Sequence, residues 1–403
     1  MIIRNFEFRI YPSPKHIRRL NENLHLCQQL YNAALEQRIS AYRNRHVSLN
    51  RFAQSRELPT LKTELPEFRD IGAQTLQEVL DRLDKSFKNF FRRVKAGSEK
   101  PGFPRFKARD RYNSYAILQH GYRLDSQTGR LELYKVGGMK IKQWKTFSPD
   151  TKIKRLTIKR SGRKWYAVFC CEMLDPKPLR ISRKEIGLDM GLKSLVMDSN
   201  GVEWGSLTEL KKRERKIRVL QQAVSGKKRG SQRRKKACRS LGAAHDKLRR
   251  YKTQELHKIS KQIVRKNGVV GLEKLNIRAM LESDNTNLSK ASLRGMKRNI
   301  QLAAWHQLQH QIIYKAEEAG RMVVLVNPRG TSQMCSRCGQ VISKDLHDRI
   351  HKCWACGLNS LRDHNSAKEI LRRARQSLRC NSGVVKSRSL VDDSATYHKG
   401  WDP

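Results

Sequence analysis

Two pairs of cysteines near the C-terminal end restrict the fold of this chain more than any other feature. Cys335 and Cys338 form one CxxC pair, Cys353 and Cys356 form another, and 14 residues separate the pairs. A glycine follows each pair and allows the chain to turn so that backbone amides face the sulfurs. Two such pairs present four thiolates to one tetrahedral zinc ion at about 2.3 Å. We therefore predict one structural Zn²⁺ in a ribbon over residues 331–360.

The alternative is four unconnected buried thiols, and the paired spacing with paired glycines argues against it. His351 and His364 lie near enough in the sequence to compete as ligands, but four cysteines already complete the coordination. The other five cysteines are scattered, and a total of nine is odd. A disulfide framework is therefore not expected.

The charge of the chain points to a polyanionic partner. Lys and Arg number 85 against 37 Asp and Glu, which gives a formal net charge of +48 in 403 residues. Nucleic acid is the first choice, because each phosphate neutralised by Lys or Arg releases condensed counterions. An anionic membrane surface is the rival, but no run of 18 apolar residues occurs and the basic residues are spread over the chain. The N-terminus lacks the features of a signal peptide, which predicts an intracellular, cytoplasmic protein.

The first half reads as a β-rich module interrupted by helices. Residues 2–11 alternate as a strand, residues 15–45 and 73–94 carry apolar positions at helical spacing, and period two returns over residues 112–173. We predict a β-barrel-like domain over residues 1–178 with a helical insertion at about 14–100. It ends at the linker-like stretch Asp175-Pro176-Lys177-Pro178.

The second half has a different pattern of apolar and basic residues. Residues 185–198 read as two short apolar strands around a turn, and residues 293–319 read as one long helix. Between residues 211 and 250 there are 17 Lys or Arg and two acids. We predict two basic helices here, joined by a linker over residues 227–236 and interrupted by Gly226, Gly230 and Gly242, with a surface that contacts phosphates.

Three carboxylates stand at the ends of expected secondary-structure elements. Asp189 lies in Gly187-Leu188-Asp189-Met190-Gly191, where neighbours without side chains leave room for a metal or phosphate. Glu273 ends the strand VVGLE, and Asp363 starts a last short helix. Each alone could hold a turn, pair with a lysine or cap a helix. Together they could converge on two Mg²⁺ ions, which at ~3.5–4 Å apart clamp both the attacking water and the leaving oxygen of a phosphodiester.

Several of these segments resemble the TnpB family of transposon-encoded, RNA-guided DNA nucleases related to type V CRISPR effectors. The resemblance rests on GLDMG followed by Lys193, on GLEKL at residues 271–275, and on CSRCG, CWACG and RDHNSAKEIL. FKNFF and GFPRF in the first half are also similar, and the resemblance covers nearly the whole chain. Ser366 departs from the family, which more often has alanine there.

The resemblance implies a multidomain α/β protein with an N-terminal wedge and recognition region and a RuvC-like, RNase H-type nuclease. Asp189, Glu273 and Asp363 would be its Mg²⁺-binding catalytic triad, with Mn²⁺ as a substitute ion. The nuclease would span residues 179–330 and 361–380, the zinc ribbon would be inserted between them, and residues 381–403 would be a polar, disordered tail. The partners would be a guide RNA and a double-stranded DNA target beside a short flanking motif, in a prokaryotic, nucleoid-associated setting and without a membrane.

Polar and basic residues in two segments, the helix over 73–94 and the basic run over 211–250, are the candidates for nucleic-acid contact. The alternative for the helix is a polar face exposed to solvent. A glutamine can form two hydrogen bonds with adenine in the major groove. The candidates are Gln74, Gln77, Arg82 and Lys85 in the helix over 73–94, and Lys227, Lys228, Arg229, Arg233 and Arg234 in the basic run.

Two other functions compete with an RNA-guided endonuclease. The first is an RNase H-like transposase that reads transposon ends itself, and the position of the ribbon between Glu273 and Asp363 disfavours it. The second is an RNA-guided repressor that binds DNA without cutting it, which would require a lost carboxylate. None of the three is lost.

Overall fold

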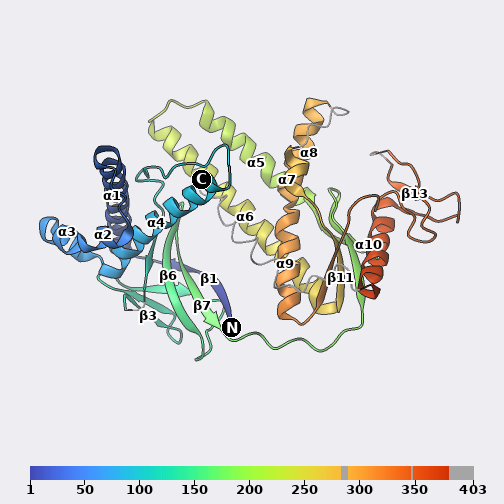
Figure 1. Cartoon of the computed structure of the whole chain (residues 1–403), viewed down its shortest axis with the longest axis horizontal. Coiled ribbons are helices and arrows are strands. Elements are labelled where there is room, and N and C mark those ends of the chain that lie inside the picture. Colours follow the sequence, from blue (N-terminus) through green and yellow to red (C-terminus); the bar gives the residue numbers. More distant parts are fainter. Residues whose placement is uncertain (119, 283–288, 346–347, 381–403) are drawn as a thin grey trace. The chain divides into compact units, whose positions relative to one another are not determined.

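The computed structural model describes residues 1–380 except 119, 283–288 and 346–347 (Figure 1). It divides into two compact units, Met1–Asp175 and a second unit that begins at Pro176. The division falls in the Asp175–Pro178 stretch, where two prolines lack the backbone N–H that secondary structure requires. The expected tail, residues 381–403, lies outside the described residues. In the described part of the chain, no helix is both long and apolar enough to span a membrane.

The first unit is built on a seven-stranded antiparallel sheet with the strand order β2-β6-β7-β1-β5-β4-β3. Alternation places Phe6, Phe8 and Ile10 of the central strand in the core. The sheet comes near to a barrel, as expected, but among the described residues its two end strands do not pair with each other. The strands are β1 (Ile2–Tyr11), β2 (Ser114–Ile117), β3 (Tyr122–Asp125), β4 (Arg130–Leu133), β5 (Gly137–Lys142), β6 (Lys152–Ser161) and β7 (Lys164–Met173).

The helices of the first unit lie between β1 and β2, as the sequence predicts. The side chain of Ser13 accepts a hydrogen bond from the backbone of His16 and caps α1 (Pro14–Arg45). The helix α4 (Ala73–Lys95) buries an apolar stripe that includes Leu76, Leu80 and Leu83. Between them lie α2 (Arg51–Arg56), α3 (Leu58–Glu64) and a 3-10 helix (Pro66–Asp70).

The second unit contains a five-stranded mixed sheet with the order β10-β9-β8-β11-β12. The strands β8, β11 and β12 are parallel, and β9 and β10 continue the sheet antiparallel. The sheet strands are β8 (Glu185–Asp189), β9 (Ser194–Asp198), β10 (Glu203–Ser206), β11 (Val269–Glu273) and β12 (Met322–Val326). The chain is therefore a mixed α/β protein.

The two faces of this sheet are covered by different helices (Figure 1). Ile186, Leu188 and Leu272 point to one core, which they share with α6 (Gln232–Lys266) and α9 (Trp305–Glu318). On the other face Gly187 and Gly271 are register partners in β8 and β11. The helix α10 (Arg362–Arg379) lies against both glycines, because a Cβ on either would meet atoms of α10 at 3.0 Å or less.

Three expectations about the second half are wrong in detail. The long helix over residues 293–319 is two helices, α8 (Lys290–Ala303) and α9, because Ala304 has a left-handed φ of 52°. Gly242 does not interrupt the basic run, since α6 continues through it. The loop between α5 (Leu207–Ser225) and α6 is short, because Ser231 caps α6 and half of the expected linker is helical.

The remaining elements are α7 (Ile277–Glu282) and a two-stranded sheet of β13 (Ile350–Lys352) and β14 (Asn359–Leu361). The break at Ala304 has a structural consequence. It starts α9 at Trp305, whose buried indole N–H donates to the carbonyl of Gly191 at 3.2 Å. The helix is thereby fixed to the turn that follows Asp189.

Candidate functional site

Three carboxylates from distant parts of the sequence gather at one edge of the second sheet. Asp189 ends β8 and Glu273 ends β11, and Leu188 and Leu272 before them are register partners in this parallel pair. Asp363 lies in the first turn of α10, which packs across the same two strands. A Cβ placed on Gly191 would lie 3.9 Å from Oδ2 of Asp363, so that carboxylate reaches the turn after β8.

Gly187, two residues before Asp189, serves a purpose other than the one expected from the sequence. Gly187 makes room for the backbone of α10, because its Cβ would lie 2.1 Å from the carbonyl oxygen of Ala367. The segment was expected to leave space for a metal or phosphate. The space is instead filled by the helix that carries Asp363, and this close approach sets the position of the third carboxylate.

The electrostatics of Asp189 reflect the two other carboxylates. Burial raises the pKa of Asp189 well above its usual value, and the negative charges of Glu273 and Asp363 raise it further. The guanidinium of Arg362 acts in the opposite direction. A cluster of carboxylates with these properties favours a bound cation, because the cation compensates charges that otherwise repel.

Glu273 is the most enclosed member of the cluster, with 9% of its surface exposed. Burial raises the pKa of its carboxyl, although the hydrogen bond from Thr331 and the charge of Arg373 lower it in part. The Thr331 hydroxyl donates to Oε1 of Glu273 at 2.5 Å. Thr331 was not selected from the sequence, and its separation of 58 residues from Glu273 leaves no local pattern to reveal it.

Arg362 is a second residue that the sequence reasoning did not select. Its Nε lies 3.3 Å from Oδ1 of Asp363, and 18% of its side chain is exposed. Its position directly before Asp363 in the chain was the available signal. The guanidinium partly balances the carboxylates without removing their net negative charge.

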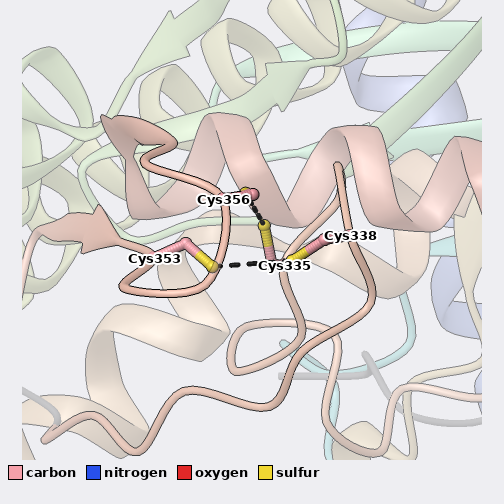
Figure 2. A group of neighbouring side chains, drawn as sticks. All are labelled: Cys335, Cys338, Cys353 and Cys356. Atoms are coloured by element: carbon pink, nitrogen blue, oxygen red, sulfur yellow. Dashed lines mark hydrogen bonds between the residues drawn. The ribbon is translucent and has the colours of Figure 1, made fainter.

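The four cysteines form the tightest group of potential metal ligands among the described residues. Their sulfur atoms all lie within 4.8 Å of one another, and Figure 2 shows them on two loops beside α10. The sulfurs of Cys335 and Cys356 are 3.7 Å apart, and those of Cys338 and Cys353 are 3.6 Å apart. Four ligands at 2.3 Å from a tetrahedral centre would be separated by about 3.8 Å. The cluster is therefore of the size that one metal ion requires.

The two cysteine loops repeat the same backbone geometry. Gly339 donates to the carbonyl of Cys335, and Gly357 donates to that of Cys353, both at 2.9 Å. Both glycines have a left-handed backbone, with φ of 80° and 71°, which residues with a Cβ adopt only at a cost. The side chains of His351 and His364 lie outside this group. The ring of His351 contacts the Lys344 ammonium, and that of His364 lies 3.2 Å from the carbonyl of Ser199.

The structure uses some of the nucleic-acid candidates internally. Arg82 donates to the carbonyl of Ser114 at 2.8 Å, and Lys85 pairs with Asp81. Lys227 donates to the carbonyl of Ala223, and Arg234 donates to those of Val224 and Lys227, so both close the end of α5. The candidates with exposed side chains are Gln74, Gln77, Lys85, Lys228, Arg229 and Arg233.

Three family models match separate parts of the chain. The model described as "Probable transposase" matches residues 168–284, which include Asp189 and Glu273. The model described as "Cas12f1-like, TNB domain" matches residues 305–370, which include the four cysteines and Asp363. A model described as "Helix-turn-helix domain" matches residues 1–46, which form β1 and α1 in this structure.

Two curated relatives match over nearly the full length, and a third matches over about half of the chain. The "Putative RNA-guided DNA endonuclease InsQ" of Escherichia coli K12 is 26% identical, and the alignment covers 96% of each chain. A "Putative RNA-guided DNA endonuclease" of Streptomyces pristinaespiralis is 28% identical over 96% of this chain and 92% of its own. The "CRISPR-associated endodeoxyribonuclease Cas12f1" of Sulfoacidibacillus thermotolerans is 28% identical over 51% of this chain and 50% of its own.

The chain is therefore similar to proteins named as RNA-guided DNA endonucleases over nearly its full length, and to the CRISPR-associated endonuclease Cas12f1 over about half of it. The chain is also similar to TnpB-like proteins of Acanthamoeba polyphaga mimivirus, at 27% identity over 53% of this chain and 41% of theirs.

Proposed function

We propose that this protein is an RNA-guided, Mg²⁺-dependent DNA endonuclease with a RuvC-like active site at Asp189, Glu273 and Asp363. One observation carries the proposal. Three carboxylates from β8, β11 and α10 meet at one edge of a sheet, where the charges of Glu273 and Asp363 raise the pKa of Asp189. The names of the full-length relatives support the same activity.

The order of the strands also supports a nuclease of the RNase H type. In that fold three antiparallel strands are followed by two parallel ones, and β10-β9-β8-β11-β12 has the same arrangement. The expected nuclease segments, residues 179–330 and 361–380, contain the whole of this sheet and α10. Within them the carboxyl ends of parallel strands meet at one edge, which is where α/β folds place their ligands.

The carboxylates fit Mg²⁺, or Mn²⁺ in its place, because hard divalent ions prefer oxygen ligands. When bound, a pair of such ions activates a water and stabilises the leaving oxygen of a phosphodiester. The protein itself holds the carboxylate oxygens in position and limits their contact with water. Arg362 adds a fixed positive charge beside Asp363, where the phosphate of a bound strand would carry its negative charge.

The remaining parts have roles that follow from their charge and composition. The four thiols would hold one structural Zn²⁺ and so fix the ribbon of residues 331–360 beside α10. The exposed lysines and arginines of α5 and α6 would bind the phosphates of a guide RNA, since protein in such complexes holds the backbone while base pairing reads the sequence. Gln74 and Gln77 remain our candidates for reading the motif beside a double-stranded target.

The test is cleavage directed by the copurified RNA. The protein should carry an RNA of defined length, and exchange of its guide segment should redirect Mg²⁺-dependent cutting to a new DNA target. Asp363→Asn and Asp363→Ala should bind the RNA normally and leave the DNA uncut. Asp150→Asn, which removes an exposed carboxylate from the first unit, is the matched control and should cut at the normal rate.

Two outcomes would favour the competing functions. Sequence-selective cutting of a transposon end by RNA-free protein would support a transposase, in keeping with the description of one matching family model. Guided binding without cleavage by the unaltered protein would support a repressor. Either result would refute the endonuclease proposal.

A further inference from the structure

A short segment that follows β12 and leads into the cysteine ribbon contacts the candidate active site. It runs from Asn327 to Thr331, and Thr331 is 3% exposed. The Thr331 hydroxyl donates to Oε1 of Glu273 at 2.5 Å and lies 3.0 Å from the carbonyl of Pro328. A hydroxyl has one hydrogen, and the shorter contact to a charged acceptor is the stronger. The hydroxyl therefore occupies one of the two carboxylate oxygens of Glu273.

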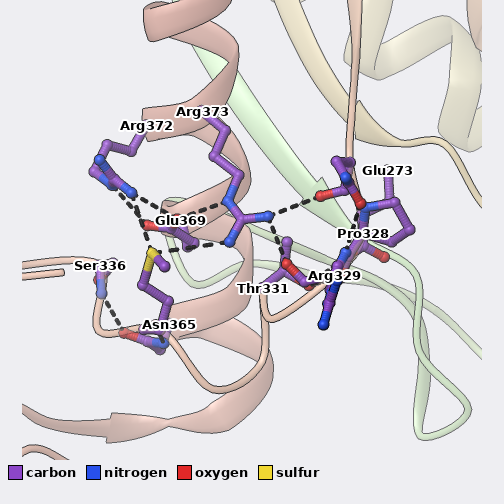
Figure 3. Close-up of polar contacts among 11 residues, drawn as sticks. Glu273, Pro328, Arg329, Thr331, Ser336, Asn365, Glu369, Arg372 and Arg373 are labelled. Atoms are coloured by element: carbon purple, nitrogen blue, oxygen red, sulfur yellow. Dashed lines mark hydrogen bonds and ion pairs between the residues drawn. The ribbon is translucent and has the colours of Figure 1, made fainter. Parts of the chain in front are cut away.

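The same segment is held from its other side by α10, as Figure 3 shows. Nη1 of Arg373 donates to the carbonyls of Asn327 and Arg329, both at 2.8 Å. Nε of Arg373 donates to Oε1 of Glu369 at 2.8 Å, and Glu369 is completely buried. The buried carboxylate fixes the planar guanidinium, and the guanidinium fixes two backbone carbonyls.

Glu369 is satisfied within this network. Arg372 donates to both of its oxygens, at 2.7 and 2.8 Å, in addition to the bond from Arg373. A buried carboxylate that lost these partners would be strongly destabilising. The arrangement therefore keeps Arg373 in one orientation, in which Nη1 points to the segment and Nη2 lies 3.8 Å from Sδ of Met334.

The helix α10 consequently positions three parts of the site: Asp363, the segment that ends in Thr331, and the first cysteine loop. α10 carries Asp363 in its first turn, and Arg373 holds the segment that ends in Thr331. Its Asn365 accepts a hydrogen bond from the backbone of Ser336 at 3.0 Å and donates to the carbonyl of Met334 at 2.8 Å. These two bonds flank Cys335, so the first cysteine loop is fixed to the same helix.

We propose that Thr331 is a positioning residue for Glu273 and that Arg373, oriented by Glu369, holds Thr331 in reach. The inference rests on the proposed function, because it assigns Glu273 to the active site. The Thr331 hydroxyl orients the Glu273 carboxylate and leaves its second oxygen for a cation. Loss of an outer partner of this kind typically lowers metal affinity or activity 10–100-fold.

A purely structural role makes a different prediction. If Thr331 serves only to tether the ribbon, its loss should lower the zinc content or the melting temperature. The affinity of the folded protein for the active-site cation would then be unchanged. The two roles are therefore separated by a binding measurement that does not depend on cleavage.

The experiment compares Thr331→Val, which keeps the shape and removes the hydroxyl, with Thr331→Ser, which keeps the hydroxyl. Mn²⁺ binding to the purified protein with its RNA is measured by calorimetry, together with zinc content, melting temperature and single-turnover cleavage. The matched control is Thr128→Val, because Thr128 also donates to a carboxylate at 2.5 Å, that of Asp125 in the first unit.

We expect Thr331→Val to weaken Mn²⁺ binding 10–100-fold and to slow cleavage, with one zinc retained. Thr331→Ser should restore both, and Thr128→Val should change neither. Arg373→Lys, which keeps the charge but cannot donate to both carbonyls in the same way, should weaken binding in the same direction. Normal Mn²⁺ affinity in Thr331→Val, or an equal loss in the serine variant, would overturn the proposal. Failure of the unaltered protein to cut guided DNA would instead refute the proposed function.

Discussion

Replacement of Gly187 by alanine tests the packing that brings the carboxylates together. A Cβ at this position would lie 2.1 Å from the carbonyl oxygen of Ala367 and 2.7 Å from the backbone nitrogen of Leu371. It would also lie 2.9 Å from Cβ of Leu371. None of these atoms can be moved by a change of rotamer, because two are backbone atoms and the third is a Cβ. The strand and the helix must therefore separate by about 1 Å to reach ordinary contact distances.

The expected consequences concern both stability and activity. Overpacking of a core lowers the free energy of unfolding by about 1–3 kcal/mol. Because the clash here is with backbone atoms, we expect a loss at the upper end of that range or above it. Asp363 lies one helical turn before Ala367, so a shift of α10 also moves this carboxylate away from Asp189. A misplacement of ~1 Å can slow a reaction about 100-fold. We expect Gly187→Ala to melt earlier and to cut guided DNA at least tenfold more slowly per folded molecule.

The measurements are thermal denaturation and single-turnover cleavage, with RNA binding as a check that the complex still assembles. Gly242→Ala is the matched control, because Gly242 lies inside α6 and a Cβ there would have nothing within 4 Å. That change should leave cleavage unaltered and stabilise the protein by up to ~1 kcal/mol. A Gly187→Ala variant with normal melting and normal cleavage would show that α10 does not lie against β8 as described.

Two further predictions concern the cysteines. Cys335→Ser should lower the zinc content from one equivalent per chain and destabilise the ribbon, because structural zinc contributes directly to folding. Elemental analysis measures the zinc content, and unaltered protein that contains no zinc would contradict the predicted site. Burial raises the pKa of Cys27 to about 12, so at pH 8 only ~10⁻⁴ of this thiol is ionised. Iodoacetamide should therefore modify the exposed Cys238 and leave Cys27 unmodified. Peptide mass spectrometry measures both sites, and rapid modification of Cys27 in folded protein would show that the first core opens.

The sequence determined the features that depend on local pattern. Period-two alternation identified β1 and the strand-rich region over residues 112–173, and helical spacing identified α1 and α4 to within a few residues. The paired cysteines with their glycines identified the metal cluster, because both the spacing and the left-handed glycines are properties of neighbouring residues. The excess of positive charge indicated a nucleic-acid partner without reference to the fold.

Only the tertiary structure decided how distant residues meet. The register of Gly187 with Gly271 creates the place where α10 lies, and no local pattern specifies which helix fills it. The break at Ala304 was missed because apolar spacing continues through it, whereas burial of Trp305 against Gly191 favours the break. The bond of Thr331 to Glu273 joins residues that are 58 positions apart in the sequence. The bonds of Arg373 to the segment before Thr331 join residues that are 46 and 44 positions apart. Such contacts depend on chain closure and packing in three dimensions, and therefore leave no periodic signal in the sequence.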